Sequence, residues 1–388
     1  VAAHAMAPRG STTGEFEAAV IEDAQAGHRL AAVRPAIEIV HTLLRPALRG
    51  HDAGDQGAVD GVLCALDGTP TKKVVGGNVC VATSMAVAKA AAAARRLPLC
   101  RHLGAPDRPR LPTPMFNVID GSKDADCGVT GVEFLLIPDA RLSIGDALEM
   151  GVAVRAGARE LAARRGWRGG DSPQGALALS LDCCEEGLEL LSRAAEGSGY
   201  APGTDFSLGL DLASSDYRDG SRYRFRWYRR PGAARAAPAD GFPVDVLLET
   251  YADWVGRYPL SFVEDGFGET DEEAWRRLTA RLGPRVRVAG DDLFASSAAR
   301  IAGGARGGLA TAALVKPNQV GTVSEALEAM RVARAAGMTV VVSQRSGEND
   351  DAVITHLAVA GEAAYLKAGG MSRMDRVMNF NELLRLAA

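Results

Sequence analysis

Residues 260–264 read LSFVE, and four more short apolar runs follow them at nearly regular distances. These five runs end, in order, at Glu264, Asp291, Lys316, Gln344 and Lys367. Successive ends are therefore 27, 25, 28 and 23 residues apart, the length of one strand, one helix and two loops. Repeated units of this size predict a closed α/β barrel, to which the earlier run Phe206–Asp211 also belongs.

The first 108 residues have a different pattern. They are rich in alanine, and residues 31–48, 55–66 and 84–94 carry apolar side chains at helical spacing. The proline-rich stretch Pro106–Pro112 then interrupts the pattern. We therefore predict a small N-terminal domain over residues 1–108 and a barrel over residues 109–388.

A long stretch separates Asp211 from Glu264 and holds an alternating basic and aromatic run, SRYRFRWYRR, at residues 221–230. Alternation of this kind is typical of a β-hairpin. We interpret the run as a solvated hairpin rather than as an anion-binding element.

Composition excludes several classes of protein. The chain has 388 residues and a net charge of −4, which argues against a general nucleic-acid binder. It shows neither a secretory signal nor an uninterrupted apolar run of the length a membrane span needs. Its six cysteines form no C-x-x-C pair, which favours reduced thiols and a cytoplasmic location. Phosphate-binding, dinucleotide-binding and serine-hydrolase glycine motifs are also missing.

Acidic residues end three of the predicted strands, at Asp211, Glu264 and Asp291. The carboxyl ends of barrel strands meet at one mouth, so these carboxylates would repel one another without a cation among them. Oxygen ligands favour a hard ion, and Mg²⁺ binds in this way beside anionic substrates. The pattern predicts a Mg²⁺ site at the mouth of the barrel.

Two lysines end strands at the same mouth, Lys316 and Lys367, although only six of the 44 basic residues are lysine. Lysine can be tuned to lose its proton, whereas arginine cannot. A lysine beside a divalent cation has a lowered pKa and can act as a base. Together with the metal, it suits removal of a proton from the carbon next to a carboxylate, because the metal stabilises the enolate that forms.

The chain resembles the enolase family over nearly its whole length. The matching segments are Gly10–Glu15, Ser84–Gly104, Leu111–Pro138, Ser261–Phe267 (SFVEDGF), Gly290–Phe294 (GDDLF), Leu314–Gly321 (LVKPNQVG), Ser343–Glu348 (SQRSGE) and Lys367–Arg385. The resemblance implies a small N-terminal α+β domain on a modified (β/α)₈ TIM barrel, a homodimer and Mg²⁺. The sequence starts just before the loop at Gly10, so the opening strands of the family are missing or lie outside it.

The resemblance also assigns roles to residues. The metal ligands implied are Asp211, Glu264 and Asp291, with the hydroxyl of Thr12 serving a second Mg²⁺. The base implied is Lys316, while Lys367 would hold the substrate carboxylate. Arg345 and Ser346 match the pair that binds phosphate, and Glu133 matches one of two glutamates beside the leaving hydroxyl.

Departures from the family lie mainly on the leaving-hydroxyl side. A loop histidine is replaced by Asp124, the glutamine before Glu133 by Val132, and the histidine of the S-H-R-S motif by Gln344. The motif with the second glutamate reads GDSPQG at residues 170–175, so Ser172 or Gln174 stands for that acid. We expect Asp124, Ser172, Gln174 and Gln344 to contact substrate. Loss of a positioned acid typically costs 10²–10⁴-fold in rate, which argues against an efficient enolase.

These changes leave the enolate-forming residues in place. We therefore expect a specialised paralogue that binds a phosphorylated three-carbon acid, with a phosphonoformyl donor as a candidate second substrate. It is similar in this respect to carboxyphosphonoenolpyruvate synthase, an enolase relative of phosphinothricin-type phosphonate antibiotic pathways. One alternative is a divergent phosphopyruvate hydratase in which Glu133 or Asp171 supplies the acid. Another is a catalytically silent enolase-like protein that binds partners.

Overall fold

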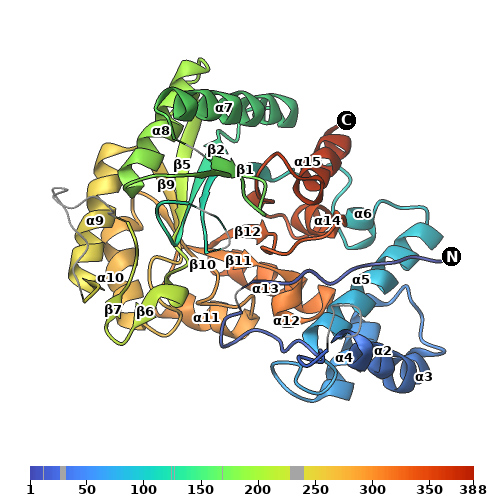
Figure 1. Ribbon diagram of the computed structural model, residues 1–388. Helices are drawn as coiled ribbons and strands as arrows, with labels where there is room; N and C mark the ends of the chain where they lie inside the picture. The colour runs from blue at the N-terminus through green and yellow to red at the C-terminus, as the bar shows by residue number, and fades with distance from the viewer. Residues whose placement is uncertain (12, 27–31, 124, 126, 168, 228–239) are drawn as a thin grey trace.

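Eight strands close into a barrel in the computed structural model, which describes residues 1–388 except 12, 27–31, 124, 126, 168 and 228–239 (Figure 1). The strands, in their order around the barrel, are β1 (Thr113–Gly121), β2 (Val132–Pro138), β5 (Phe206–Asp211), β9 (Leu260–Glu264), β10 (Arg287–Gly290), β11 (Ala312–Val315), β12 (Thr339–Ser343) and β13 (Tyr365–Lys367). Parallel pairing of β13 with β1 closes the ring. The prediction of a closed α/β barrel is confirmed.

Six of these strands end at the last residue of an apolar run in the sequence or one residue before it. The pattern did not single out β1 and β2, whose residues are buried throughout. A strand covered on both faces lacks the alternation that identifies a half-exposed strand. β2 runs antiparallel to both of its neighbours, so the barrel departs from an all-parallel one.

Alternate residues of the strands face inward and fill the barrel. This inner cluster includes Met115, Leu135, Ile137, Phe262, Ala289, Ala312, Leu314 and Val341, all buried. The opposite faces of the strands pack against the surrounding helices in a second, larger apolar layer. The barrel is therefore a packed core, and its rim is left to carry polar side chains.

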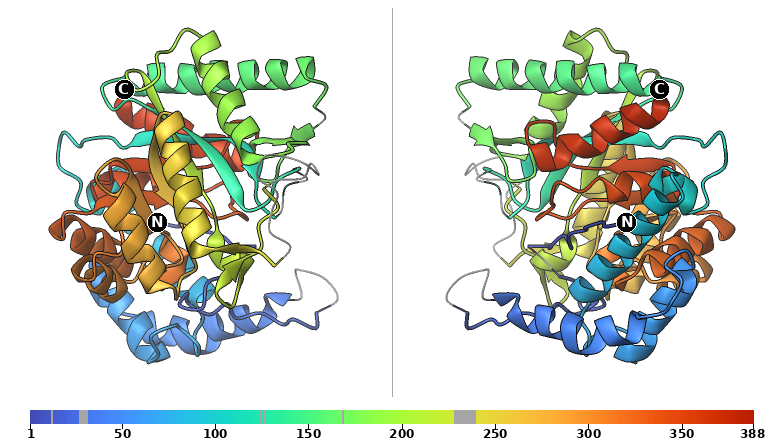
Figure 2. Two further views of the ribbon diagram at one scale, coloured as in Figure 1. Left: turned by 90° about the vertical axis from the view of Figure 1, so that its left-hand side faces the viewer. Right: turned by 90° about the vertical axis from the view of Figure 1, so that its right-hand side faces the viewer.

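Helices surround most of the ring (Figure 2). They are α7 (Ile144–Arg164), α8 (Cys184–Gly197), α9 (Val244–Arg257), α10 (Glu272–Leu282), α11 (Ala298–Arg306), α12 (Pro317–Val320), α13 (Val323–Ala335), α14 (Val353–Ala360) and α15 (Met374–Ala387). Side chains cap the first turns of several, including Ser143 on α7 and Thr322 on α13. A short hairpin, β3 (Gly169–Asp171) with β4 (Leu177–Leu179), attaches to β1.

The described part of residues 1–108 is helical, with α2 (Arg34–Ile39), a π-helical turn η1 (Val40–Leu44), α3 (Arg45–Leu48), α4 (Gln56–Asp67), α5 (Gly77–Ala94) and α6 (Leu99–His102). The π-helical turn comes just before Pro46, which has no N–H for a regular helical hydrogen bond. α5 is long and apolar enough to cross a membrane, but half of its 18-residue window is buried within the protein. Those properties are equally typical of a core helix.

The N-terminal segment before these helices returns to the barrel. Arg9 and Gly347 exchange backbone hydrogen bonds of 2.9 and 2.8 Å, and the Ala18 N–H donates to the carbonyl of Gln319. In Figure 1 this dark blue segment passes across the barrel near β11, β12 and α12. Residues 9–11 and 13–18 thus lie beside the ends of strands that come some 300 residues later in the sequence.

The basic and aromatic run at 221–230 pairs as a hairpin over its described strand, as predicted, but the expectation that it is solvated is wrong for its aromatic face. β7 (Arg222–Tyr223) pairs with β6 (Arg218–Asp219) and β8 (Phe242–Pro243), while Tyr223, Phe225 and Trp227 are almost fully buried. The Phe225 and Trp227 rings stack 4.0 Å apart, centroid to centroid. One face of the run therefore belongs to the core, and residues 228–230 lie outside the described part.

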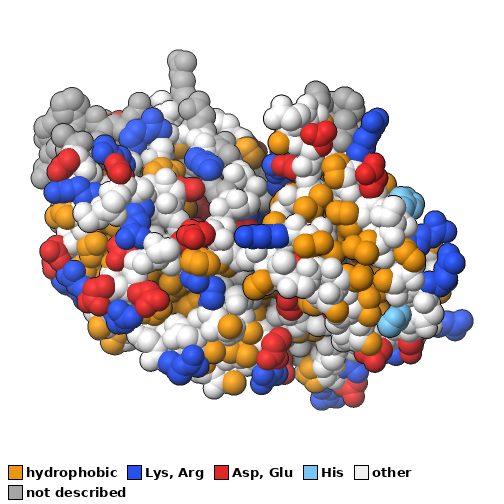
Figure 3. All heavy atoms as spheres, turned by 90° about the horizontal axis from the view of Figure 1, so that it is seen from below, with side chains coloured by type: hydrophobic (Ala, Val, Ile, Leu, Met, Phe, Trp, Pro, Cys, Tyr) orange, Lys and Arg blue, Asp and Glu red, His pale blue; other side chains and the backbone are white. Residues whose placement is uncertain are grey.

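The surface carries charges of both signs. On the face seen from below, Lys and Arg side chains lie among Asp and Glu side chains, with apolar side chains gathered between them (Figure 3). This mixture agrees with a net charge of only −4.

A buried histidine predicts an acid-sensitive contact between α6, α14 and α15. His356 Nδ1 accepts the Cys100 N–H at 3.3 Å, and Nε2 lies 3.2 Å from Glu382. Burial lowers the pKa of His356 to about 4, below its ordinary value of 6.5. Because the unfolded chain takes up this proton first, the free energy of unfolding should fall as pH drops from 6.5 to 4, by up to roughly 3 kcal/mol from this group.

Urea unfolding of the wild type, His356→Gln and His51→Gln at pH 7 and pH 5 measures this contribution. We expect a smaller loss at pH 5 in His356→Gln than in the wild type. His51 is exposed and serves as the matched control. Equal losses in all three proteins would contradict the assignment.

Candidate active site

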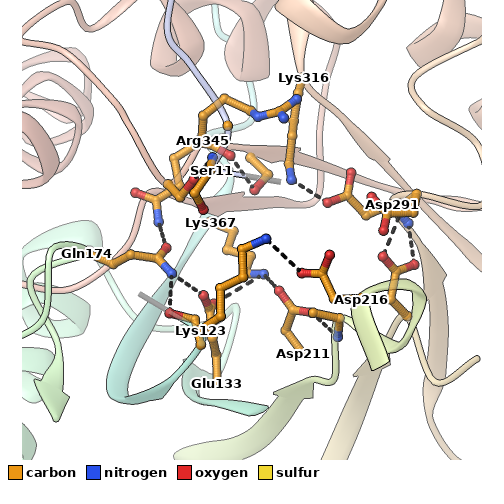
Figure 4. A pocket seen from close by; sticks show the side chains of 18 of the residues that line it. Ser11, Lys123, Glu133, Gln174, Asp211, Asp216, Asp291, Lys316, Arg345 and Lys367 are labelled. Atoms are coloured by element: carbon orange, nitrogen blue, oxygen red, sulfur yellow. Dashed lines mark hydrogen bonds and ion pairs between the residues drawn. The ribbon is translucent and has the colours of Figure 1, made fainter. Parts of the chain in front are cut away.

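A small cavity lies at the carboxyl ends of the barrel strands, where barrel enzymes place their catalytic residues. It has a volume of about 90 Å³. Asp211 and Lys367 end their strands, and Asp291, Lys316 and Gln344 directly follow theirs. All five line the cavity, together with Glu133 from β2 and Gln174 from the β3–β4 hairpin (Figure 4).

Lys367 lies at the centre of a buried acidic group. Its Nζ is 2.5 Å from Asp211, 2.8 Å from Glu264 and 3.5 Å from Glu133. Burial alone would lower the pKa of Lys367, but the surrounding carboxylates raise it well above its ordinary value. Lys367 therefore holds its charge and can attract a substrate carboxylate into the cavity, but it is a poor candidate for a base.

Lys316 approaches from another side of the cavity, where its Nζ contacts Asp291. Burial would lower the pKa of Lys316, but the Asp291 carboxylate outweighs burial and raises it. The lowered pKa expected for Lys316 beside a bound divalent cation stays a prediction. Lys316 can act as a base only when another cation binds the Asp291 carboxylate, because that carboxylate otherwise keeps Lys316 protonated.

The predicted phosphate-binding residues face the N-terminal segment. Arg345 Nη1 lies 2.7 Å from Glu17 in an ion pair that is almost fully buried, and the Ser11 N–H donates to Ser346 Oγ at 2.6 Å. Glu17 also accepts from Gln319, whose amide donates to Asp291 at 3.0 Å. The segment thus connects the phosphate side with the metal side. Thr12 lies outside the described residues, so its predicted role stays a prediction.

Three buried side chains form a relay with fixed polarity. Arg376 can only donate, and it donates to Gln344 Oε1, so the Gln344 amide nitrogen donates to Gln174 Oε1 at 2.8 Å. The Gln174 nitrogen must then point to Glu133 Oε1, at 2.5 Å, and to Ser122 Oγ, at 3.5 Å. Gln174 therefore presents a neutral hydrogen-bond donor to the cavity.

The structure also distinguishes the two residues that could stand for the second acid. Ser172 Oγ accepts the backbone N–H groups of Gln174 and Ala176, so it stabilises the turn rather than lining the cavity. Asp171 lies 2.6 Å from both Arg155 and Arg159, and it is not among the cavity-lining residues either. Asp124, the remaining predicted contact, lies outside the described residues.

Comparison with protein families agrees with this geometry. A model of the enolase N-terminal domain matches residues 1–103, and a model of the enolase C-terminal TIM barrel domain matches residues 109–388. The chain belongs to the enolase family. It is accordingly an enzyme of the enolase superfamily, a group that typically uses Mg²⁺.

The residues present fit a divalent cation. Asp265, Asp291 and Asp292 offer oxygens that all lie within 4.8 Å of one another. Of the predicted ligands, this cluster includes only Asp291, while Asp211 and Glu264 contact Lys367. The Asp265 carboxylate also accepts the backbone N–H groups of Asp291 and Asp292, at 2.9 and 3.1 Å.

Charge balance supports the same fit. Seven carboxyl side chains line the cavity against four cationic ones. Burial and neighbouring carboxylates raise the pKa of Asp292 to about 7, and they raise the pKa of Glu264 and Asp265 well above the ordinary range. Carboxylates in this state cannot all ionise without a further cation, and oxygen donors suit Mg²⁺.

Sequence reasoning missed three residues of this site. Arg376 sets the polarity of the relay, Glu17 pairs with Arg345, and Lys123 lines the mouth. Arg376 falls in a segment that resembles the family, and Lys123 is one of only six lysines, so weak signals for both were present. Glu17 carried no signal, because its partner is 328 residues away.

Proposed function

We propose that this enzyme removes the α-proton from a phosphorylated three-carbon acid, while its leaving-group side serves a reaction other than simple dehydration. The observation that carries the proposal is the contrast between the two sides of the cavity. Lys316 and Lys367 face it as buried lysines among carboxylates. On the other side, the neutral Gln174 donates to Glu133, and Asp171, the only carboxyl group of the segment GDSPQG, does not line the cavity.

Each group of a substrate such as 2-phosphoglycerate has a matching partner. Lys367 would hold the carboxylate, and Arg345 with Ser346 would hold the phosphate. Lys316 Nζ would accept the α-proton once its contact with Asp291 is relaxed. Asp291, with the carboxylates around it, would hold Mg²⁺, which when bound stabilises negative charge on the substrate carboxylate.

The specific reaction that we propose is of the carboxyphosphonoenolpyruvate synthase type, in phosphonate antibiotic biosynthesis. Its support comes from three replacements: Gln174 stands for an acid, Gln344 for a titratable histidine, and Val132 for a hydrogen-bonding glutamine. A phosphonoformyl donor would meet that side.

Phosphopyruvate hydratase is a second candidate, and Glu133 favours it. Burial raises the pKa of Glu133 to about 7, so this side chain can carry a proton to a leaving hydroxyl near neutral pH. The Gln174 amide donates to Glu133 Oε1 and so holds the Glu133 carboxyl group in place.

Two measurements on the Mg²⁺-loaded protein with 2-phosphoglycerate separate these reactions. Proton NMR in D₂O reports exchange at the α-carbon, and absorbance of the enol product reports dehydration. We expect exchange with dehydration at least about tenfold slower. Dehydration as fast as exchange would establish the hydratase instead, and absence of exchange would favour a silent binding protein.

Gln174→Glu sharpens the test, because it returns a carboxyl group beside Glu133. A positioned acid is worth roughly 10²–10⁴-fold, so we expect dehydration to rise at least about tenfold in this variant. Gln174→Met, of similar size but without an acid, is the matched control and should not gain dehydration. A gain in both variants, or in neither, would contradict the proposed role of Gln174.

A further inference from the structure

Lys123 lies at the mouth of the cavity and has no role in the proposed proton removal. It is the second residue after β1, and its Nζ stands 3.7 Å from Asp216 in the 3-10 turn η2 (Ser214–Tyr217) across the mouth. Figure 4 shows the two side chains directed at each other over the cavity. Lys123 is thus a third lysine facing the cavity, besides Lys316 and Lys367.

Two further donors lie on the same side as Lys123. Ser122 Oγ is 3.5 Å from Gln174 Nε2, and both residues line the cavity. The relay from Arg376 keeps the Gln174 nitrogen directed toward this side. The Gln174 amide uses its two N–H groups on Glu133 and Ser122, so the Ser122 hydroxyl accepts from Gln174 and can donate its own hydrogen into the cavity. The Lys123 ammonium on the next residue also lines the cavity, and an ammonium with a hydroxyl suits an anion.

The contact of Lys123 with Asp216 is easily exchanged. The two side chains are 44% and 31% exposed, and 3.7 Å is long for an ion pair. Pairs of this kind contribute little to stability, because water solvates both charges and salt screens them. An anionic ligand can replace Asp216 as the ion-pair partner of Lys123, and water then solvates the Asp216 carboxylate.

We propose that this side of the cavity binds a second anionic group, a carboxylate, phosphate or phosphonate, held by Lys123 and by Ser122, whose hydroxyl Gln174 orients. The inference rests on the proposed function, in which Lys367 and Arg345 already hold the two anionic groups of the three-carbon acid. Lys316 is the proposed base, so Lys123 is the remaining cationic side chain that lines the cavity, and it matches an additional anion carried by a second substrate. Lys123 acts in this scheme as a specificity-determining residue.

Calorimetry tests the proposal with the full chain, Mg²⁺ and saturating 2-phosphoglycerate. Phosphonoformate, which carries a phosphonate and a carboxylate, is titrated into this complex, and inorganic phosphate is titrated separately. We expect binding that does not weaken as 2-phosphoglycerate is raised. Lys123→Gln should weaken it at least about tenfold, as expected for loss of a charge-assisted hydrogen bond, while Lys123→Arg should retain most of it.

Lys73→Gln is the matched control, because Lys73 is an exposed lysine that does not line the cavity. It should bind both anions as the wild type does. The proposal is overturned if no second anion binds, if it competes with 2-phosphoglycerate, or if Lys123→Gln binds it as tightly as the wild type. Exchange of the α-proton without a second anion is measured separately in the wild type, so failure of the proposed function is distinguishable from failure of this inference.

Discussion

Lys316→Ala should slow α-proton exchange of 2-phosphoglycerate by roughly 10²–10⁴-fold, because the cavity then lacks its positioned base. Among the described residues that line the cavity, the other lysines are less suited to the task. Lys367 is held in its charged form by Asp211 and Glu264, and Lys123 lies half-exposed at the mouth. NMR exchange rates in D₂O with saturating Mg²⁺ measure the effect.

Lys316→Arg provides the control for charge. It keeps a cation near Asp291, but a guanidinium cannot accept the proton. We therefore expect Lys316→Arg to lose exchange as Lys316→Ala does, while 2-phosphoglycerate binding by calorimetry changes far less than the exchange rate. Exchange in Lys316→Arg at the wild-type rate would show that another group is the base.

The second large effect is expected on stability. Lys367→Met removes the cation between Asp211, Glu264 and Glu133 and leaves their carboxyl groups buried. Breaking a buried ion pair from one side typically costs about 3–5 kcal/mol. Without Mg²⁺ at neutral pH, we expect a loss of that size in the free energy of unfolding. The loss should shrink as pH falls, because the carboxylates then take up protons.

Added Mg²⁺ should restore part of the stability of Lys367→Met, since a cation in the acidic cavity replaces part of the lost charge. Lys72→Met is the matched control. Lys72 is equally buried, but its ion-pair partner Glu325 is 37% exposed and far more easily hydrated. Urea unfolding with and without Mg²⁺ measures both variants. A Mg²⁺ effect of the same size in Lys72→Met would contradict a cation site beside Lys367.

Much of the barrel could be predicted from local patterns. Six short apolar runs, five of them at near-constant spacing, located six strands, and their last residues supplied Asp211, Glu264, Asp291, Lys316 and Lys367. Such patterns are local, because the alternation of strands and helices depends on neighbouring residues. The antiparallel β2 and the buried face of residues 222–227 depend instead on what covers each segment, and reading along the chain could not show them.

The sequence by itself determined the fold, the family and the residue types at the strand ends. Only the tertiary structure decided which groups touch: that Gln174 rather than Ser172 lines the cavity, that Arg376 sets its polarity, and that Lys316 contacts Asp291. These contacts join segments up to hundreds of residues apart, so no local pattern encodes them. The ionisable groups of the site also lie close together in a buried cavity, so the pKa of each group depends on the charges of the others.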